Sequence, residues 1–353
     1  MARRVRDVRC PFLVHRTELL GNWVKARFPR PYPLIEPASA DASFRRYFRL
    51  RFVGGAPPRI VMDAPPDKED CRPFVAVGAL LDAAGINVPC VIEADFDHGF
   101  LLLADLGSQT FLSALRADIG VADALYRDAI DTLVRMQVGA GAQTLASYDR
   151  ELLLRELELL PEWYIARYRA FELDARQRAA LGGTFDILIA NNLAQARVFV
   201  HRDYHSRNLM VCSPADGTGA NPGVLDFQDA VRGPITYDLV SLLKDAYIEW
   251  PEERVLDWAI RYWESARRAG LPVNGEFGEF YRDFEWMGLQ RHLKVLGIFA
   301  RLDRRDGKAQ YLDDLPRVMR YVRKTCERYA AFTPLLRILD AVENIEVRPG
   351  YTF

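Results

Sequence analysis

Hydrophobic and polar residues alternate along the first part of the chain in a way that is typical of a small antiparallel sheet. Residues 16–28 carry apolar positions at helical spacing and end before Pro29, which predicts an amphipathic helix. Residues 44–53 alternate apolar and charged side chains, as a half-buried strand does. The turn residues 54–58 lead into a second short strand at 60–62, so the two strands are predicted to form a hairpin.

The pattern changes near residue 104, where predicted strands give way to predicted helices. A helix is expected at 71–84, and short strands are expected at 91–92 and 100–103. Helical periodicity then dominates the chain, apart from a strand-rich segment at 197–227. The later helices are predicted at 109–116, 121–138, 149–168, 174–193 and from 237 to about 345.

Strands followed by helices, without regular alternation of the two, are typical of an α+β fold. We therefore predict a small β-rich lobe over residues 1–104 and a larger, mostly helical lobe over residues 105–353. The length of 353 residues is enough for two such domains or one large one.

Composition and charge exclude several classes of function. Lys and Arg total 47 against 48 Asp and Glu, which is unlike the basic excess of nucleic-acid-binding domains. No apolar run approaches the ~18 residues of a membrane span. The five cysteines are scattered and form no CxxC pair, so neither a disulfide framework nor a zinc site is indicated. We expect a cytoplasmic monomer that binds neither nucleic acid nor membrane.

The densest polar cluster is the segment HRDYHSRN, between two apolar segments. Asp226 ends another apolar segment, 18 residues after Asn208. Phosphoryl transfer needs a carboxylate that orients the acceptor hydroxyl and takes its proton, and it needs hard oxygen ligands for Mg²⁺. The order His-x-Asp-x-x-x-x-Asn followed by Asp-Phe supplies both. Asp203 is the candidate catalytic base, and Asn208 and Asp226 are the candidate metal ligands.

These motifs resemble the kinase-like superfamily of aminoglycoside phosphotransferases and choline kinases. HRDYHSRNLM at 201–210, GVLDFQDAVRGPITYDL at 223–239 and GFLLLADLG at 99–107 carry the resemblance. It covers roughly residues 35–330 and implies a two-lobed protein-kinase-like fold that uses ATP and Mg²⁺. It also implies that Asp238 supports the catalytic loop.

The same resemblance implies a nucleotide site in the small lobe. Backbone groups near Asp105 and Gly107 would meet the adenine. The chain has no GxGxxG loop, and the small residues Ser39 and Ser43 stand in its place, where they would let backbone N–H groups approach phosphate.

The strand lysine that usually pairs the ATP phosphates is missing. Asp63 occupies the matching position. Arg45, Arg46 and Arg72 are the nearest cations in sequence, and strand alternation predicts that Arg45 and Arg46 point to opposite faces. We take Arg45 as the candidate phosphate ligand.

Three further segments are similar to the bacterial kinases that phosphorylate the anomeric C1 hydroxyl of N-acetylmuramate and N-acetylglucosamine. They are SADASFRRYF at 39–48, VMDAPP at 61–66 and QRHLK at 290–294. This resemblance implies an amino-sugar kinase of cell-wall recycling. A sugar carboxylate would favour a bidentate arginine, so Arg291 is a candidate substrate residue, together with Asp229.

Three alternatives stay open at this point. The acceptor could be another small alcohol, such as an aminoglycoside, choline or homoserine, although the basic residues of 291–305 argue mildly against a cationic substrate. The missing lysine favours an ATP-binding pseudokinase, whereas the intact catalytic and metal motif argues against one. A metallohydrolase built on His201, Asp203 and His205 would need further ligands, and the remaining histidines are isolated in the sequence.

Overall fold

The computed structural model describes residues 11–40 and 44–345 and packs as two compact units. The first unit runs to Ala79 and resumes at Val88–Ser108. The second unit consists of Leu80–Asn87 and the chain from Gln109 onward. The lobe boundary expected between residues 104 and 105 stays a prediction.

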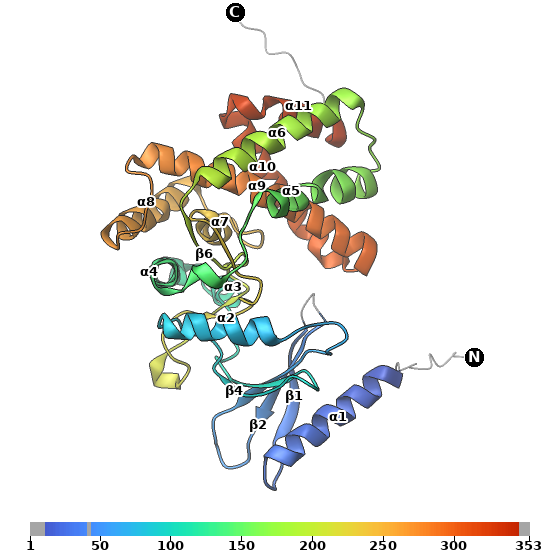
Figure 1. Ribbon diagram of the computed structural model, residues 1–353, viewed down its shortest axis with the longest axis vertical. Coiled ribbons are helices and arrows are strands. Elements are labelled where there is room, and N and C mark those ends of the chain that lie inside the picture. Colours follow the sequence, from blue (N-terminus) through green and yellow to red (C-terminus); the bar gives the residue numbers. More distant parts are fainter. Residues whose placement is uncertain (1–10, 41–43, 346–353) are drawn as a thin grey trace, which may run out of the picture. The chain divides into compact units, whose positions relative to one another are not determined.

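The first unit is built on a five-stranded antiparallel sheet in the order β1-β2-β3-β5-β4. Strands β1, β2 and β4 of this sheet are labelled in Figure 1. Its elements are α1 (Pro11–Arg27), β1 (Leu34–Ala40), β2 (Arg46–Arg51), β3 (Arg59–Asp63), β4 (Val91–Asp95), β5 (Phe100–Ala104) and the first two turns of α2 (Arg72–Ala83), whose residues from Leu80 onward belong to the second unit. The predicted helices and the predicted hairpin of β2 and β3 are confirmed. Strand β1 was missed, because Pro37 and a register shift after it disguise the alternation.

Helix α1 covers one face of this sheet. The contact buries Leu20, Trp23, Val24, Leu50, Val61, Phe100 and Leu102. Side chains two residues apart on a strand share a face, so Asp63 lies on the same face as Val61. Arg46, the register partner of Asp63, shares that face through Phe48 and Leu50. The β3 aspartate is therefore directed toward α1.

The second unit is mostly helical, as predicted, with two short strand pairs inserted. Its helices are α3 (Phe111–Ala117), α4 (Ala122–Gly139), α5 (Arg150–Leu157), a π-helix (Leu160–Tyr168), α6 (Ala175–Ala194), α7 (Tyr237–Leu243), α8 (Glu252–Arg268), α9 (Phe277–Asp306), α10 (Leu315–Arg328) and α11 (Thr333–Glu343). Its strands are β6 (Arg197–Val200), β7 (Leu209–Met210), β8 (Gly223–Val224) and β9 (Val231–Pro234). None of the helices in the described part of the chain is long and apolar enough to cross a membrane.

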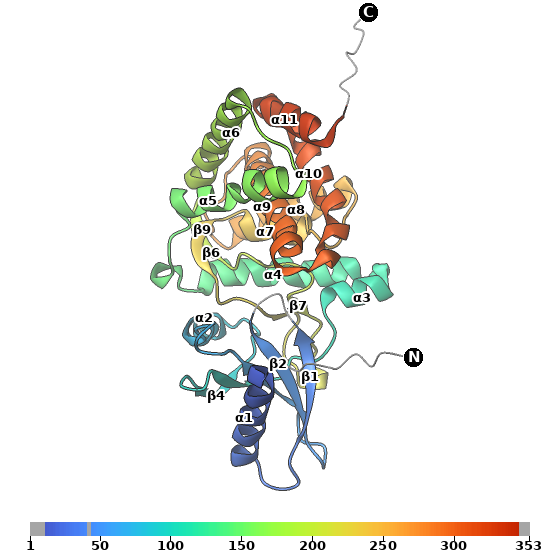
Figure 2. The same cartoon turned by 90° about the vertical axis from the view of Figure 1, so that its right-hand side faces the viewer.

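Two strand pairs and one long helix position the polar residues of this unit. Strand β6 pairs with β9, and β7 pairs with β8. The 30-residue helix α9 runs through the unit, and α5, α6, α7, α8, α10 and the π-helix pack against it (Figure 2). The segment between β6 and β7 contains residues 201–208, and we call it the catalytic loop after the role that the sequence predicts for Asp203.

Candidate active site

The start of the catalytic loop is held by the carboxylate of Asp238. This residue of α7 is fully buried and accepts hydrogen bonds from the backbone N–H groups of His201, at 2.6 Å, and Arg202, at 2.9 Å. Arg202 has a φ of 77°, a left-handed conformation that costs a non-glycine residue about 1–3 kcal/mol. The two bonds fix this conformation directly before Asp203. The supporting role expected of Asp238 is confirmed.

Asp203 is half-buried in the loop, and its backbone N–H donates to Nδ1 of His201 at 3.2 Å. Burial by itself would raise the pKa of Asp203, but nearby positive charges, Lys294 and Arg291 foremost, lower this pKa to about 2. The carboxylate is therefore ionised at neutral pH. An ionised carboxylate can accept a hydrogen bond from an acceptor hydroxyl.

The two histidines of the loop, His201 and His205, are neutral side chains that pack against aromatic rings. Burial lowers the pKa of His201 to about 4 and also lowers the pKa of His205. The His201 ring lies 5.8 Å from the ring of Tyr204, and the His205 ring lies 5.3 Å from that of Tyr247. Over residues 11–40 and 44–345, no group of three or more His, Cys, Asp or Glu side chains is arranged to hold a metal ion.

The two predicted metal ligands lie side by side. Asn208 Nδ2 donates to the carbonyl of Asp203 at 3.0 Å and to Oδ2 of Asp226 at 3.3 Å. Gln228 Nε2 donates to the other oxygen of Asp226 at 3.1 Å. Mg²⁺ at phosphoryl-transfer sites takes one or two protein oxygens and completes its shell with phosphates and water. The amide and carboxylate oxygens of this pair fit such an ion.

The two candidate substrate residues lie in the same unit. Arg291 of α9 is 4% exposed, and its guanidinium lies 5.7 Å from the centre of the Tyr237 ring. In the described part of the chain no hydrogen bond or ion pair joins this guanidinium to another residue. Asp229 accepts a hydrogen bond from Gln228 at 3.1 Å, and its carbonyl accepts one from Arg202 at 3.3 Å. Arg291 is thus a buried cation in the electrostatic neighbourhood of Asp203.

Two buried carboxylates that the sequence analysis did not single out also hold the loop. Asp245 Oδ2 accepts from the backbone N–H of Ser206 at 3.0 Å and from its hydroxyl at 2.5 Å. Glu156 accepts from Arg202 at 2.5 Å. Asp245 lies just beyond the mostly apolar stretch 239–243, and an acid at this place is a signal that could have identified it. Glu156 lies in an ordinary amphipathic helix and offers no local signal.

The predicted phosphate-binding residues belong to the first unit. Ser39 lies in β1, whereas Ser43 is outside the described residues. Arg45 is 7% exposed and forms an ion pair with Glu69 at 3.0 Å. Arg72 instead pairs with Asp70 at the surface.

Asp63 is enclosed by two arginines. Arg16 of α1 donates to its Oδ1 through Nε at 2.8 Å and through a second nitrogen at 2.6 Å, and Arg46 forms an ion pair with its Oδ2. The Asp63 side chain is completely buried. A buried carboxylate with two cationic partners is satisfied structurally, so the β3 position contributes to the packing of α1 on the sheet.

The two predicted adenine-binding residues are joined through Arg49. Arg49 donates to both carboxylate oxygens of Asp105, at 2.5 and 3.0 Å, and to the carbonyl of Gly107 at 2.6 Å. The N–H of Gly107 donates back to Asp105 at 2.9 Å. Gly107 has a φ of 93°, which a residue without a Cβ adopts at no steric cost. The segment from 105 to 107 is therefore held in a closed hydrogen-bonded turn.

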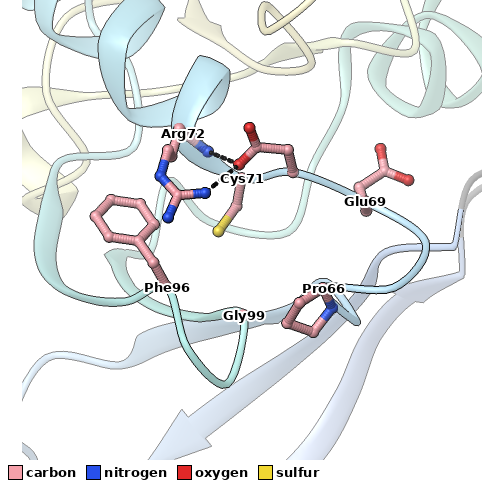
Figure 3. A pocket seen from close by; sticks show the side chains of 7 residues that line it. Pro66, Glu69, Cys71, Arg72, Phe96 and Gly99 are labelled. Atoms are coloured by element: carbon pink, nitrogen blue, oxygen red, sulfur yellow. Dashed lines mark hydrogen bonds and ion pairs between the residues drawn. The ribbon is translucent and has the colours of Figure 1, made fainter.

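A pocket of about 210 Å³ lies in the first unit, where the segment after β3 enters α2 (Figure 3). It is lined by Pro66, Glu69, Asp70, Cys71, Arg72, Phe96 and Gly99. Arg72 lies 5.1 Å from the ring centre of Phe96. Because Glu69 lines the pocket and pairs with Arg45, the candidate phosphate-binding arginine lies beside it.

Comparison with known proteins places these residues in a family context. Residues 34–272 match the model of the phosphotransferase enzyme family. An N-acetylmuramate/N-acetylglucosamine kinase from Neisseria meningitidis is 50% identical over 337 residues, which are 95% of this chain and 98% of that protein. A protein of the same name from Caulobacter vibrioides is 32% identical, over 89% of this chain and 93% of its own length.

Solved structures show the same fold at much lower identity. A choline kinase from Streptococcus pneumoniae is similar with a TM-score of 0.61 and 10% identity, over 88% of this chain and 99% of the other. An ADP-bound aminoglycoside phosphotransferase is similar with a TM-score of 0.53 and 14% identity, over 87% and 97% of the two chains. The two-lobed kinase-like fold expected from the sequence is confirmed. The chain belongs to the phosphotransferase enzyme family, in the group that contains the N-acetylmuramate/N-acetylglucosamine kinases.

Proposed function

We propose that the protein is an ATP-dependent kinase that phosphorylates the anomeric C1 hydroxyl of N-acetylmuramate, N-acetylglucosamine or both, in the recycling of cell-wall sugars. One observation carries the proposal. The chain that is 50% identical to a Neisseria meningitidis kinase of these sugars also places an ionised Asp203 next to an Asn208–Asp226 pair.

In this reaction the Asp203 carboxylate accepts a hydrogen bond from the acceptor hydroxyl. Its low pKa makes it a weak base, so its main contribution is orientation of the hydroxyl, with proton uptake as the bond to phosphorus forms. The rigid loop backbone supports this role, because Asp238 fixes the two residues before it. Orientation of reactants can supply several kcal/mol of the barrier reduction.

Asn208 and Asp226 would hold Mg²⁺. The ion, when bound, neutralises charge on the transferring phosphates. For ATP we propose contacts with Ser39, Ser43 and Arg45, and with the backbone turn that Asp105 and Gly107 form. Arg45 is supported by its place beside the pocket of the first unit, because its ion-pair partner Glu69 lines that pocket.

The acceptor sugar is proposed to contact Arg291 and Asp229. A buried guanidinium without an ion-pair partner in the described chain favours an anionic ligand. The lactyl carboxylate distinguishes N-acetylmuramate from N-acetylglucosamine. Arg291 therefore supports N-acetylmuramate as an acceptor, while Asp229 would accept hydrogen bonds from sugar hydroxyls.

The remaining parts of the proposal concern the protein's surroundings. We propose that it acts in the cytoplasm as a monomer, on small molecules only. Four described cysteines (Cys71, Cys90, Cys212 and Cys326) are free thiols, which agrees with a reducing compartment.

The proposal is tested by measuring ADP release with ATP, Mg²⁺ and a panel of acceptors. The panel contains the two amino sugars, an aminoglycoside, choline and homoserine. Turnover with an amino sugar that falls at least about a thousandfold in Asp203→Asn supports the proposal. Preference for another alcohol would contradict the sugar assignment, and ATP binding without turnover on any acceptor would favour a pseudokinase.

A further inference from the structure

Glu156 is a buried acid of α5 that contacts three donors from different parts of the second unit. It is 5% exposed. It accepts hydrogen bonds from the hydroxyl of Tyr148 and from a guanidinium nitrogen of Arg202 at 2.5 Å, and it pairs with the ammonium group of Lys294 at 2.9 Å. Burial by itself would raise the pKa of Glu156, but the charges of Lys294 and Arg202 lower it, so the side chain is an anion at neutral pH.

Each cation that Glu156 holds is tied to Asp203. Arg202 precedes Asp203 in the chain, and its backbone is held in the left-handed region. Lys294 projects from α9 and donates to the hydroxyl of Tyr237 at 3.1 Å, and Tyr237 directly precedes Asp238, which holds the loop backbone before Asp203. Glu156 thus connects α5, the catalytic loop and α9 through one carboxylate.

Asp238 and Glu156 hold Arg202 in different ways. Asp238 binds its backbone N–H, whereas Glu156 binds its side chain. The same guanidinium donates to the carbonyl of Asp229, so the side chain of Arg202 spans from α5 to the segment after the metal acid Asp226.

We propose that Glu156 is a positioning residue of the phosphoryl-transfer site: by holding Arg202 and Lys294 in fixed places near Asp203, it keeps the Asp203 carboxylate where the acceptor hydroxyl must bind. This inference rests on the proposed role of Asp203 in the reaction. A displacement of about 1 Å in such a group can cost about a hundredfold in rate.

A matched control exists in the same unit. Glu285 of α9 is 3% exposed and also holds one lysine, one arginine and one tyrosine. Its donors are Lys244 at 3.2 Å, Arg328 at 2.6 Å and Tyr329 at 2.8 Å. None of these three belongs to the catalytic loop. Both glutamates are buried anions, so replacing either with glutamine perturbs stability in a similar way.

The test compares Glu156→Gln with Glu285→Gln in the full chain, by thermal unfolding and by steady-state kinetics with ATP and the preferred amino sugar. We expect both variants to lower the unfolding temperature. Glu156→Gln is expected to lower kcat by about tenfold to a hundredfold, with both KM values within about twofold of the unmodified protein. Glu285→Gln is expected to keep kcat within about twofold. Equal kcat losses in the two variants, or an unchanged kcat in Glu156→Gln, would overturn the proposal.

A double-mutant cycle with Arg202→Met tests whether Glu156 acts through the arginine. We expect the kcat of the double variant to be no lower than the kcat of the less active single variant, because both substitutions remove the same contact. Multiplied losses would show that Glu156 acts independently of Arg202 and would overturn the inference.

A double variant keeps the proposal testable if Glu156→Gln does not fold. Glu156→Gln combined with Lys294→Met removes one charge of each sign, which a buried network tolerates better. A kcat loss of at least about tenfold with unchanged KM in this variant supports the positioning role, and a kcat near that of the unmodified protein overturns it. Asp203→Asn is measured in parallel, because turnover that survives this change would refute the proposed function itself and not the role of Glu156 alone.

Discussion

The guanidinium of Arg49 donates hydrogen bonds to both carboxylate oxygens of Asp105 and to the carbonyl of Gly107. The pair is largely buried, with 15% of the Arg49 side chain and 3% of the Asp105 side chain exposed. The Asp105 carboxylate is therefore neutralised by the protein. We therefore propose that the backbone of Asp105, and not its side chain, contacts the adenine.

From this relationship we predict that Arg49→Leu raises the KM for ATP by about tenfold, since it frees the turn and leaves Asp105 without its partner. The KM for the sugar should stay within about twofold of its usual value. Arg51→Leu is the control, because Arg51 lies on the same strand but forms a single exposed ion pair with Glu36. An ATP KM that is equal in the two variants would refute the role of the turn.

Asp63 gives a second prediction, on stability. Asp63→Ala should lower the free energy of unfolding by about 3–5 kcal/mol, because it leaves Arg16 and Arg46 without a counter-charge inside the contact between α1 and the sheet. Asp63→Lys introduces the lysine that the strand motif of protein kinases carries at the matching position. We expect it to destabilise the fold further and to leave ATP binding no tighter, because the side chain is directed toward α1. A lower KM for ATP in Asp63→Lys would contradict this placement. Denaturant unfolding and ATP kinetics measure both effects.

Arg291 gives a prediction on specificity. Arg291→Met should raise the KM for N-acetylmuramate by about tenfold to a hundredfold, since hydrogen bonds to a charged group are worth about 1.5–3 kcal/mol. The KM for N-acetylglucosamine, which has no carboxylate, should change by less than about threefold. Arg301→Met, on the same helix, serves as the control variant. Equal changes for the two sugars would mean that Arg291 does not read the carboxylate.

The loss of folding stability at acid pH should depend on His292. This residue is 1% exposed, its ring stacks on Tyr321 at 4.8 Å, and its Nε2 lies 2.9 Å from the carbonyl of Lys244. Burial, with a smaller contribution from the charge of Lys244, lowers the pKa of His292 from 6.5 to about 3. The unfolded chain therefore binds a proton before the folded chain does.

His292 thus stabilises the fold fully above about pH 6.5, and this contribution is lost as the pH falls toward 3. We expect the free energy of unfolding to fall by about 2 kcal/mol between pH 6.5 and 5 through this group alone. His292→Gln should remove that part of the pH dependence, whereas His98→Gln, at an exposed position, should not. Denaturant unfolding at the two pH values checks this, and a slope that is identical in all three proteins would contradict it.

Local patterns predicted the elements that have a strong period. The hairpin of β2 and β3, the helices and the strands around residues 201–208 follow from alternation and helical spacing. Strand β1 did not follow, because Pro37 interrupts its alternation, and β9 did not follow because Gly233 and Pro234, two residue types that are depleted in strands, end it. The neighbourhood of Asn208 and Asp226 followed from the motif, since Asn208 directly precedes β7 and Asp226 lies two residues after β8, at the same end of this pair of strands.

Contacts between distant segments could not be read in the same way. One partner of Asp63 is Arg16, which lies 47 residues earlier in a helix with no distinguishing motif. Glu156 meets Lys294 only because α5 and α9 pack together, and no local pattern records which helices do so. The sequence motif identified the candidate reacting groups, whereas the residues that hold these groups in position became visible only in the structure.

The central claim is that this chain transfers a phosphoryl group from ATP to the C1 hydroxyl of an N-acetylated amino sugar. Phosphorus and carbon NMR of the product formed with ATP, Mg²⁺ and either N-acetylmuramate or N-acetylglucosamine tests it most directly. We predict a phosphate ester whose phosphorus couples to the anomeric proton and to C1, and its absence in the Asp203→Asn variant. Coupling to C6 or another carbon, or no sugar phosphate with either substrate, would contradict the claim.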